Sequence, residues 1–298
     1  MARKRTELWQ VGIVHRPVTA LLDAGALAQA DITWLPDPGS FRFIADPFGL
    51  WHDGRFTVLA EAYDYRNKRG EIHFYEYDAD FALLRSGVAL RTPFHLSYPQ
   101  IIVRDGEIYM LPEAHRSGKL TLYRATRFPE AWEPVADLLD IAAIDASVVE
   151  HEGRWWMFYA LPGDDNRAMR ELHVAYASDL MGPWTQHSGN PLRRDLQSSR
   201  PGGQPFIHEG RVYLPVQDCD GGYGVGLKVL RIDELTPNAF KASVVADLRP
   251  DGVLPGYEDG LHTLSAAGEV TLIDVKRLDP SPLRPLIDIQ RRIGRLLR

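Results

Sequence analysis

A pattern repeated five times along the chain restricts the fold more than any other feature of the sequence. Each copy has a run of apolar residues, then an acidic or small residue followed by Gly, and then alternating apolar residues. A Gly between two β-prone runs indicates a tight hairpin, because the turn needs a positive φ. The copies occupy residues 48–59, 101–111, 147–158, 205–214 and 264–273, with turn glycines Gly54, Gly106, Gly153, Gly210 and Gly268. The sequence therefore predicts five hairpins of one kind.

Further strands are expected after the first four hairpins. Third strands with the period-two alternation of half-buried β-structure lie at 70–77, 118–124, 170–176 and 224–230, and fourth strands are expected near 86–90, 133–138, 184–187 and 241–246. A repeat of roughly 50 residues carrying four antiparallel strands is typical of one propeller blade. We therefore predict an all-β, five-bladed β-propeller with four-stranded antiparallel blades. A generic β-sandwich would leave the five similar hairpins unexplained.

The predicted propeller occupies residues 1–280. Its blades start near residues 46, 98, 145, 200 and 260. The chain that follows residue 273 is too short for a complete fifth blade. We therefore expect the segment 8–14 to close the ring as the missing outer strand of that blade.

The tail at 281–298 has a different pattern from the propeller. Apolar residues recur with a helical period, at Leu283, Leu286, Ile289, Ile293, Leu296 and Leu297. Residues 283–298 carry five Arg and one Asp, a side-chain charge of +4, which leaves −10 on the rest of a chain whose total is −6. A basic amphipathic helix of this kind lies on an anionic membrane or docks on a partner protein. Packing against the propeller is the alternative.

Composition excludes several classes of protein. The single Cys219 rules out an internal disulfide. No apolar run is long enough for a transmembrane helix, and the basic N-terminus lacks the apolar core of a signal peptide. A net charge of −6 argues against a nucleic-acid partner, which needs a basic face. We expect a cytoplasmic protein, with the basic tail making peripheral contact with the inner face of the membrane or with a partner.

The repeat also predicts where polar residues meet. Residues at the same distance in sequence from each turn glycine should form a ring around the central axis. The first ring, eight residues before each glycine, consists of Asp46, Tyr98, Asp145, Gly202 and Gly260. The second ring, six residues before each glycine, consists of Phe48, Gln100, Ser147, Gln204 and His262. The third ring, seven residues after each glycine, consists of Glu61, Glu113, Ala160, Gln217 and Val275. Asp218 follows Gln217, and Asp274 precedes Val275. Carboxylates concentrated at the narrow end of a propeller must be paired with cations or hydrogen-bond donors, or they serve the function of the site.

Asp46 and Asp145 are the leading catalytic candidates, since each begins an inner strand two blades apart. Glycosidic chemistry needs two carboxyl groups, one protonated and one ionised. Glu113, or less favourably Glu61, is the candidate for the acid. The competing interpretation for each carboxylate is structural: Asp46 stands before Pro47, where it could simply cap a turn.

The remaining ring residues are candidates for binding a ligand. Arg200 could bind an anionic group or pair with a central carboxylate, and His262 could contact a hydroxyl or serve only the structure. Aromatic Tyr63, Tyr98 and Tyr223 could stack on a sugar. The full set of predicted substrate-binding residues is Glu61, Tyr98, Gln100, Arg200, Gln204, Gln217, Asp218, Tyr223, His262 and Asp274. No spacing of ligands indicates a metal, and no phosphate-binding loop indicates a nucleotide cofactor, so we expect neither.

Several motifs resemble known families. The sequence Ala-Asp-Pro-Phe at 45–48, Asp145, and the segments 178–184 and 189–192 resemble the five-bladed arabinanase/xylosidase and invertase/levansucrase glycoside hydrolases. That resemblance implies a base or nucleophile at Asp46 and an orienting carboxylate at Asp145. It also implies an acid in blade four, but that blade begins with Ser-Arg-Pro-Gly-Gly at 199–203, a segment that has no Glu.

A second resemblance covers almost the whole chain. Segments 95–100, 109–113, 200–203, 217–219, 223–224 and 260–263 are similar to the N-terminal propeller domain of the glucosamine inositolphosphorylceramide transferase type. In the plant protein the recognised glycosyltransferase fold lies in another domain. The resemblance implies a propeller in a carbohydrate-related, glycosyltransferase-associated setting.

Two functions follow as hypotheses. The first is an enzyme acting on a glycosidic linkage of a glycoconjugate or polysaccharide intermediate, through Asp46, Asp145 and Glu113. The second is a non-catalytic glycan or sugar-nucleotide binding module that works with a separate glycosyltransferase. A protein-interaction propeller is the third reading, and it predicts an apolar or charged rim instead of a polar pocket.

Overall fold

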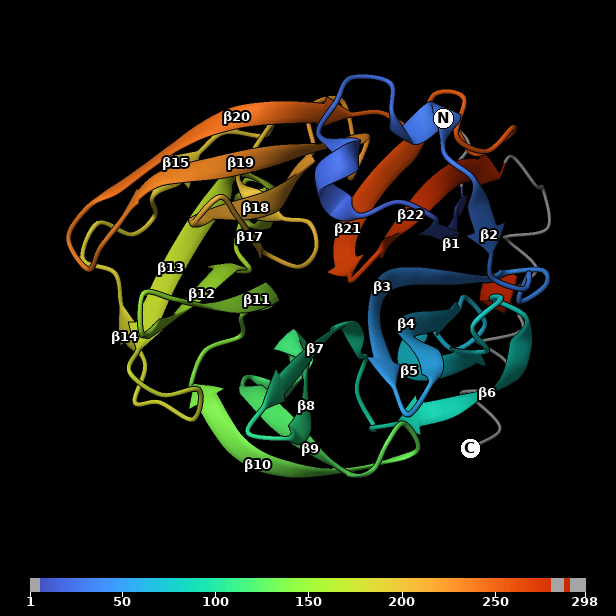
Figure 1. Cartoon of the computed structure of the whole chain (residues 1–298), viewed down its shortest axis with the longest axis horizontal. Coiled ribbons are helices and arrows are strands. Elements are labelled where there is room, and N and C mark those ends of the chain that lie inside the picture. Colours follow the sequence, from blue (N-terminus) through green and yellow to red (C-terminus); the bar gives the residue numbers. More distant parts are fainter. Residues whose placement is uncertain (1–5, 280–286, 290–298) are drawn as a thin grey trace.

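Five antiparallel sheets surround a central axis in the computed structural model of the protein, which describes residues 6–279 and 287–289. Each sheet is a blade, and the blades follow one another around the ring in chain order (Figure 1). The predicted all-β, five-bladed propeller is confirmed.

Four blades are built from consecutive strands. Blade one comprises β3 (Arg42–His52), β4 (Arg55–Asp64), β5 (Arg69–Tyr77) and β6 (Leu83–Leu90), and blade two comprises β7 (Ser97–Arg104), β8 (Glu107–Glu113), β9 (Leu120–Arg127) and β10 (Ala131–Leu139). Blade three comprises β11 (Ile144–His151), β12 (Arg154–Ala160), β13 (Glu171–Ala177), β14 (Thr185–Gln186) and β15 (Arg193–Arg194). Blade four comprises β16 (Arg200–Pro201), β17 (Phe206–His208), β18 (Arg211–Asp218), β19 (Gly226–Leu235) and β20 (Phe240–Leu248).

The fifth blade combines the two ends of the propeller. It comprises β21 (Gly260–Ala267), β22 (Val270–Asp279), β1 (Thr6–Val14) and β2 (Ile32–Trp34), in the order β2-β1-β22-β21. An N-terminal strand therefore closes the ring, as predicted, but β1 is the third strand and β2 the outermost one. The side chains of Val11 and Ile13 are fully buried, and this apolar run requires an interior position.

The helices are short. The structure describes 3₁₀ turns η1 (Val18–Leu21), η2 (Leu27–Gln29) and η3 (His115–Ser117), and the α-helix α1 (Arg167–Arg170). None of the described helices has the length and apolar character needed to cross a membrane. Of the tail predicted at 281–298, residues 287–289 are helical, with Ile287 buried, and the rest lies outside the described residues. Its membrane or partner contact stays a prediction.

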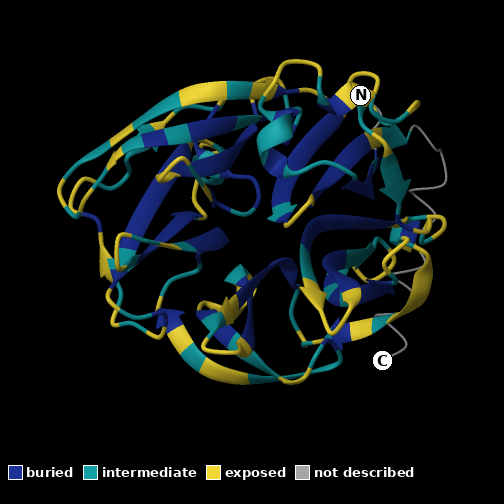
Figure 2. Cartoon of the chain, in the orientation of Figure 1, coloured by how far each residue is buried: buried dark blue, intermediate teal, exposed yellow. Residues whose placement is uncertain are grey.

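Apolar side chains fill the space between neighbouring blades. One cluster joins Val11 and Ile13 of blade five to Phe56 and Val58 of blade one, and comparable clusters lie at the other four seams. Buried residues accordingly follow the inner strands, while exposed residues gather on the outer strands and turns (Figure 2). Because each seam needs the next blade, the fold is stable only as a closed ring.

The inner strands begin with a β-bulge, which sets the orientation of the first polar residue of each strand. The pairing register shifts between Ala45 and Phe48 in blade one and between Leu261 and Leu264 in blade five. Asp46 has a φ of 53° at the first of these bulges, and Asp145 has a φ of 49° at the bulge between Ile144 and Ser147 in blade three. In blade five the bulge contains His262, so His262 and not Gly260 is equivalent to Asp46. The glycine-based register fails there because His262 stands six residues before Gly268, whereas Asp46 stands eight residues before Gly54.

Closure by β1 should govern stability. We expect Ile13→Ala to lower the free energy of unfolding by about 2–4 kcal/mol, because it leaves a cavity at the seam between the last and first blades. The matched Ile207→Ala, whose side chain is 46% exposed, should change it by less than about 1 kcal/mol. Urea unfolding at neutral pH measures both. Equal losses would show that the seam has no special role.

Candidate functional site

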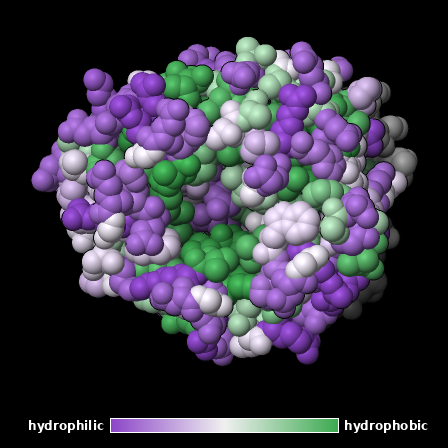
Figure 3. Space-filling model, in the orientation of Figure 1, coloured by the Kyte–Doolittle hydropathy of each residue, from purple (hydrophilic) through white to green (hydrophobic). Residues whose placement is uncertain are grey.

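A pocket of about 220 Å³ lies where the inner strands begin. Figure 3 shows one face of the ring, which is hollowed at its centre, with hydrophobic residues along part of the wall of that hollow. Seven predicted site residues line the pocket: Asp46, Glu61, Glu113, Asp145, Arg200, Tyr223 and His262. The repeat therefore located most of the charged groups at the site.

Six other predicted residues do not line this pocket: Tyr98, Gln100, Gln204, Gln217, Asp218 and Asp274. Tyr98 is fully buried, and its hydroxyl lies 2.8 Å from both Ser147 Oγ and the Gly203 carbonyl oxygen. The Gln100 amide forms two hydrogen bonds with the backbone of Val148. These two side chains join neighbouring blades.

The other four lie behind or away from the pocket. Gln217 donates to Asp145 Oδ2 at 3.0 Å, and the backbone N–H of Gln204 donates to the Leu264 carbonyl oxygen. The carboxylate of Asp218 pairs with Arg249 and Lys228, outside the pocket. Asp274 is fully buried behind His262.

Sequence reasoning missed most of the aromatic wall. The pocket is also lined by Glu7, Trp9, Phe43, Ala45, Tyr63, Tyr65, His95 and Ser97, of which only Tyr63 was a candidate. Phe43 and Tyr63 stack with ring centroids 4.8 Å apart. Trp9 comes from the closing strand, which the repeat does not include. His95 stands in the motif at 95–100, so the resemblance carried the only signal for it.

Asp274, His262 and Asp46 lie in a row, with His262 in the middle. His262 Nδ1 lies 2.7 Å from Asp274 Oδ1, and its Nε2 lies 3.5 Å from Asp46 Oδ1. The imidazole stacks on Trp9 with ring centroids 3.7 Å apart, which fixes the plane of the ring. Thr263 Oγ1 donates to Asp46 Oδ1 at 3.2 Å. Burial raises the pKa of Asp46 to about 6, although the nearby His262 opposes the shift.

These three residues also have the composition of a metal site. Their ligand atoms all lie within 4.8 Å of one another. The Asp274 carboxylate, however, already accepts from the backbone N–H groups of Asp46, His262 and Thr263, and it lies against His262 Nδ1 as well. Its oxygens therefore serve the internal structure, and a cation would have to displace those bonds. The arrangement fits proton handling better than metal binding.

A second unit joins Glu113, Asp145 and Arg200. Arg200 Nε donates to Asp145 Oδ2 at 2.7 Å, and the guanidinium lies over the Tyr223 ring. Burial raises the pKa of Asp145 well above its usual range, while Arg200 opposes the shift. Burial acts on Glu113 in the same direction, but the hydrogen bond to His115 at 2.6 Å and the charge of Arg200 outweigh it and lower its pKa to about 2. Glu113 is therefore ionised.

Glu61 is the carboxyl group best placed to keep its proton. Its Oε1 is buried without a hydrogen-bond partner among the described residues. Burial raises its pKa well above the usual range, and the surrounding carboxylates, Asp46 first, raise it further. The backbone N–H of Gly70 donates to His95 Nδ1 at 2.8 Å, so the neutral His95 carries its proton on Nε2, 3.5 Å from Glu61 Oε1. Burial lowers the pKa of His95 to about 4, so the ring stays neutral.

The electrostatics reverse the order of the two acid candidates. Sequence reasoning preferred Glu113 to Glu61. The repeat itself cannot separate them, because it places both at equivalent positions and says nothing of their partners. The structure gives Glu113 the partners that favour a carboxylate. It leaves Glu61 in surroundings that favour the neutral acid.

The fold and its axial pocket define a five-bladed β-propeller with a carboxylate-lined site at the ring centre. Residues 28–250 match the family described as glucosamine inositolphosphorylceramide transferase 1, N-terminal, and the chain belongs to that family. It is 36% identical over 216 residues to glucosamine inositolphosphorylceramide transferase 1 of Oryza sativa subsp. indica, a match covering 69% of this chain and 28% of the rice protein. The Arabidopsis thaliana protein is 31% identical over 208 residues, covering 67% and 27%. The chain thus spans less than a third of these relatives.

Solved structures with this fold include glycoside hydrolases. The catalytic domain of the Coprinopsis cinerea GH62 α-L-arabinofuranosidase aligns with a TM-score of 0.58 at 11% identity, over 80% of this chain and 93% of that one. A GH43 β-xylosidase/α-arabinofuranosidase from a compost metagenome aligns with a TM-score of 0.55 at 14% identity, over 80% and 91%. At these identities the similarity establishes the fold alone.

Burial of Asp46 predicts a pH-dependent cost to stability. Its pKa rises from 3.8 to about 6 on folding, so the native state holds this proton more tightly than the unfolded state and loses stability as pH rises through that range. Relative to wild type, Asp46→Asn should gain about 2 kcal/mol in unfolding free energy between pH 4 and pH 7. Urea titrations at both pH values measure this gain.

The control is Asp105→Asn, at a side chain that is 85% exposed. Its difference from wild type should stay nearly constant between the same pH values. A constant difference for Asp46→Asn as well would contradict the raised pKa.

Proposed function

We propose that this protein is a carbohydrate-active propeller whose axial pocket acts on a glycosidic linkage of a glycoconjugate or polysaccharide intermediate. The observation that carries the proposal is one pocket containing buried carboxyl groups of opposite proton affinity beside an aromatic wall. Glycosidic cleavage or transfer needs one carboxylic acid and one carboxylate on the two sides of the scissile bond. The aromatic rings suit the apolar faces of a sugar.

In this mechanism Glu61 protonates the glycosidic oxygen as the bond to the anomeric carbon breaks. Its proton is available because burial and the neighbouring carboxylates keep the acid neutral. Asp46 acts from the carboxylate form, either as base towards a water or acceptor hydroxyl or as nucleophile. Thr263 and His262 hold its Oδ1 in place. Activity should therefore rise as pH increases through about 6, where Asp46 ionises.

Asp145, Arg200 and Glu113 would position the sugar. The bond from Arg200 to Asp145 fixes the guanidinium between the carboxylate and the Tyr223 ring. Its outer N–H groups can donate to a sugar hydroxyl or to an anionic substituent, while the Glu113 carboxylate accepts from hydroxyl groups. Asp145 thus keeps the orienting role expected from the sequence. Glu113, the acid proposed from the sequence, is instead assigned to ligand binding.

Blade four favours a second function, a non-catalytic glycan or sugar-nucleotide binding module that serves a separate glycosyltransferase. Where the related hydrolases are expected to hold an acid, this chain has Gly202 and Gly203. A Cβ at Gly203 would overlap the backbone of Leu264, so no carboxylate can replace it. The relatives named above are transferases of which the chain covers less than a third.

Product analysis separates the two functions. A panel of glycans and sugar nucleotides is incubated with the protein, and binding is scored by calorimetry and products by mass spectrometry. We expect a product, and Asp46→Asn should slow its formation by about 100-fold or more while binding persists. Glu107→Gln, at an exposed carboxylate, is the control and should leave both unchanged. Binding without product would favour the binding module, and full turnover by Asp46→Asn would refute the assignment of Asp46.

The identity of the acid has its own test. Glu61→Gln should lose about 100-fold or more on a natural glycoside but little on an aryl glycoside whose leaving group departs without protonation. Glu113→Gln should affect both substrates alike, because a binding residue does not depend on the leaving group. The reverse pattern would restore Glu113 as the acid.

A further inference from the structure

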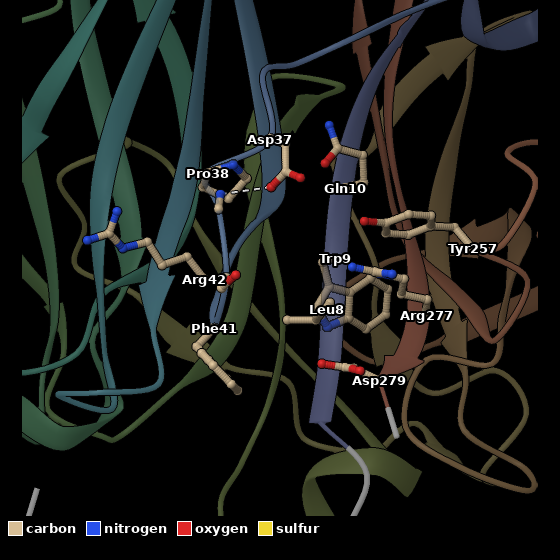
Figure 4. A pocket seen from close by; sticks show the side chains of 12 residues that line it. Leu8, Trp9, Gln10, Asp37, Pro38, Phe41, Arg42, Tyr257, Arg277 and Asp279 are labelled. Carbon is tan, nitrogen blue, oxygen red and sulfur yellow. Dashed lines mark hydrogen bonds between the residues drawn. The ribbon is translucent and has the colours of Figure 1, made fainter. Parts of the chain in front are cut away.

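A second hollow, the rim groove, lies across strand β1 beside the axial pocket. It has a volume of about 180 Å³. Asp37, Phe41 and Arg42 stand on one side of β1, and Tyr257, Arg277 and Asp279 stand on the other (Figure 4). Leu8, Trp9 and Gln10 of β1 form its floor.

The groove exists because the outer strand of blade five is short. β2 pairs only with Gly12, Ile13 and Val14, whereas β1 pairs with β22 along all nine of its residues. Beyond the bond from the Leu35 N–H to the Val11 carbonyl, the chain leaves β1 and reaches blade one through the loop at 36–41. No described strand pairs with the outer edge of β1 at Leu8, Trp9 and Gln10, and the groove lies along this part of β1, although the three side chains are themselves buried.

The groove and the axial pocket share a wall. Trp9 lines both, and the consecutive residues Phe41, Arg42 and Phe43 pass from one to the other. The Trp9 indole stacks on the His262 imidazole and its ring centre lies 5.0 Å from Lys276 Nζ, and these contacts position the shared wall. A chain of linked rings seated at the carboxylates could continue past Trp9 into the groove.

The chemistry of the groove differs from that of the axial pocket. Its charged residues are two Arg and two Asp, so their formal charges cancel, whereas carboxylates outnumber the single Arg in the axial pocket. Arg277 is exposed, and its guanidinium lies 5.2 Å from the centre of the Tyr257 ring, which supports it. Planar guanidinium and carboxylate groups bind adjacent hydroxyls, and aromatic rings contact the apolar face of a sugar. A groove with balanced charge favours a neutral sugar.

We propose that the rim groove is a second sugar-binding subsite, which holds a neutral ring of the same glycan whose reacting linkage lies in the axial pocket. This inference rests on the proposed carbohydrate function. It adds that the ligand is an oligosaccharide or an extended glycoconjugate. It also makes Arg277 and Tyr257 the residues that determine which length of glycan binds most tightly.

Chain-length dependence of binding tests the subsite. The probes are neutral arabino-, xylo- and manno-oligosaccharides of one to six residues, titrated by calorimetry into the full-length protein. In the series that binds, the affinity should rise about tenfold at the length that reaches the groove, as expected for a few additional hydrogen bonds. Arg277→Ala and Tyr257→Ala should remove that rise and leave the affinity for the shortest binding sugar unchanged. Arg127→Ala, whose side chain is 74% exposed in blade two, is the matched control and should keep the rise.

The outcomes distinguish this proposal from the one on which it rests. If short sugars bind, and Glu113→Gln weakens that binding, but affinity does not depend on length, the axial site stands and the rim subsite is wrong. A loss of affinity in Arg277→Ala at every length would also overturn the subsite. If no probe of any length binds, the carbohydrate function fails and the subsite fails with it.

Discussion

The buried carboxylate of Asp274 is the interaction on which both the ring and its site depend. It lies on β22 and accepts the backbone N–H of Asp46 across the seam between the last and the first blade. It also accepts the N–H groups of His262 and Thr263 and lies 2.7 Å from His262 Nδ1. One side chain thus fixes the two bulges that present Asp46 and His262. Because a buried acceptor left unsatisfied is costly, the same bonds hold the propeller closed and keep the site aligned.

The distribution of charge near Asp274 explains why the carboxyl groups of the pocket differ in pKa. Asp46, Glu61, Glu113 and Asp145 lie within one pocket, and burial acts on all four in the same direction. Their local partners separate them. Glu113 has His115 and Arg200 nearby and is ionised, whereas among the described residues Oε1 of Glu61 has no hydrogen-bond partner and lies 3.5 Å from the neutral His95. An acid and a carboxylate can coexist at neutral pH because the protein distributes its donors unequally.

The sequence predicted the ring more completely than it predicted the site. Gly54 and its four counterparts mark turns that need positive φ, and their spacing is enough to infer five blades. Offsets from these glycines also located Asp46 and Asp145. They placed His262 in a different ring from Asp46, because His262 stands two residues closer to its turn glycine than Asp46 does, and the offsets cannot show this difference. They could not separate Glu61 from Glu113, since equivalent backbone positions have different neighbours. The contacts of Tyr98 and Gln100 with the next blade were equally invisible, because hydrogen bonds between blades leave no periodic signal.

The closing strand connects these observations. β1 carries Val11 and Ile13 into the seam and Trp9 into the pocket, so the strand that completes the ring also completes the aromatic wall. Until β1 is in place, His262 lacks the ring on which it stacks, and the axial pocket and the rim groove lack their common wall. Ring closure and site formation are therefore one event. A ligand that contacts Trp9 from either side stabilises the closed propeller, since it binds a surface that the open ring does not have.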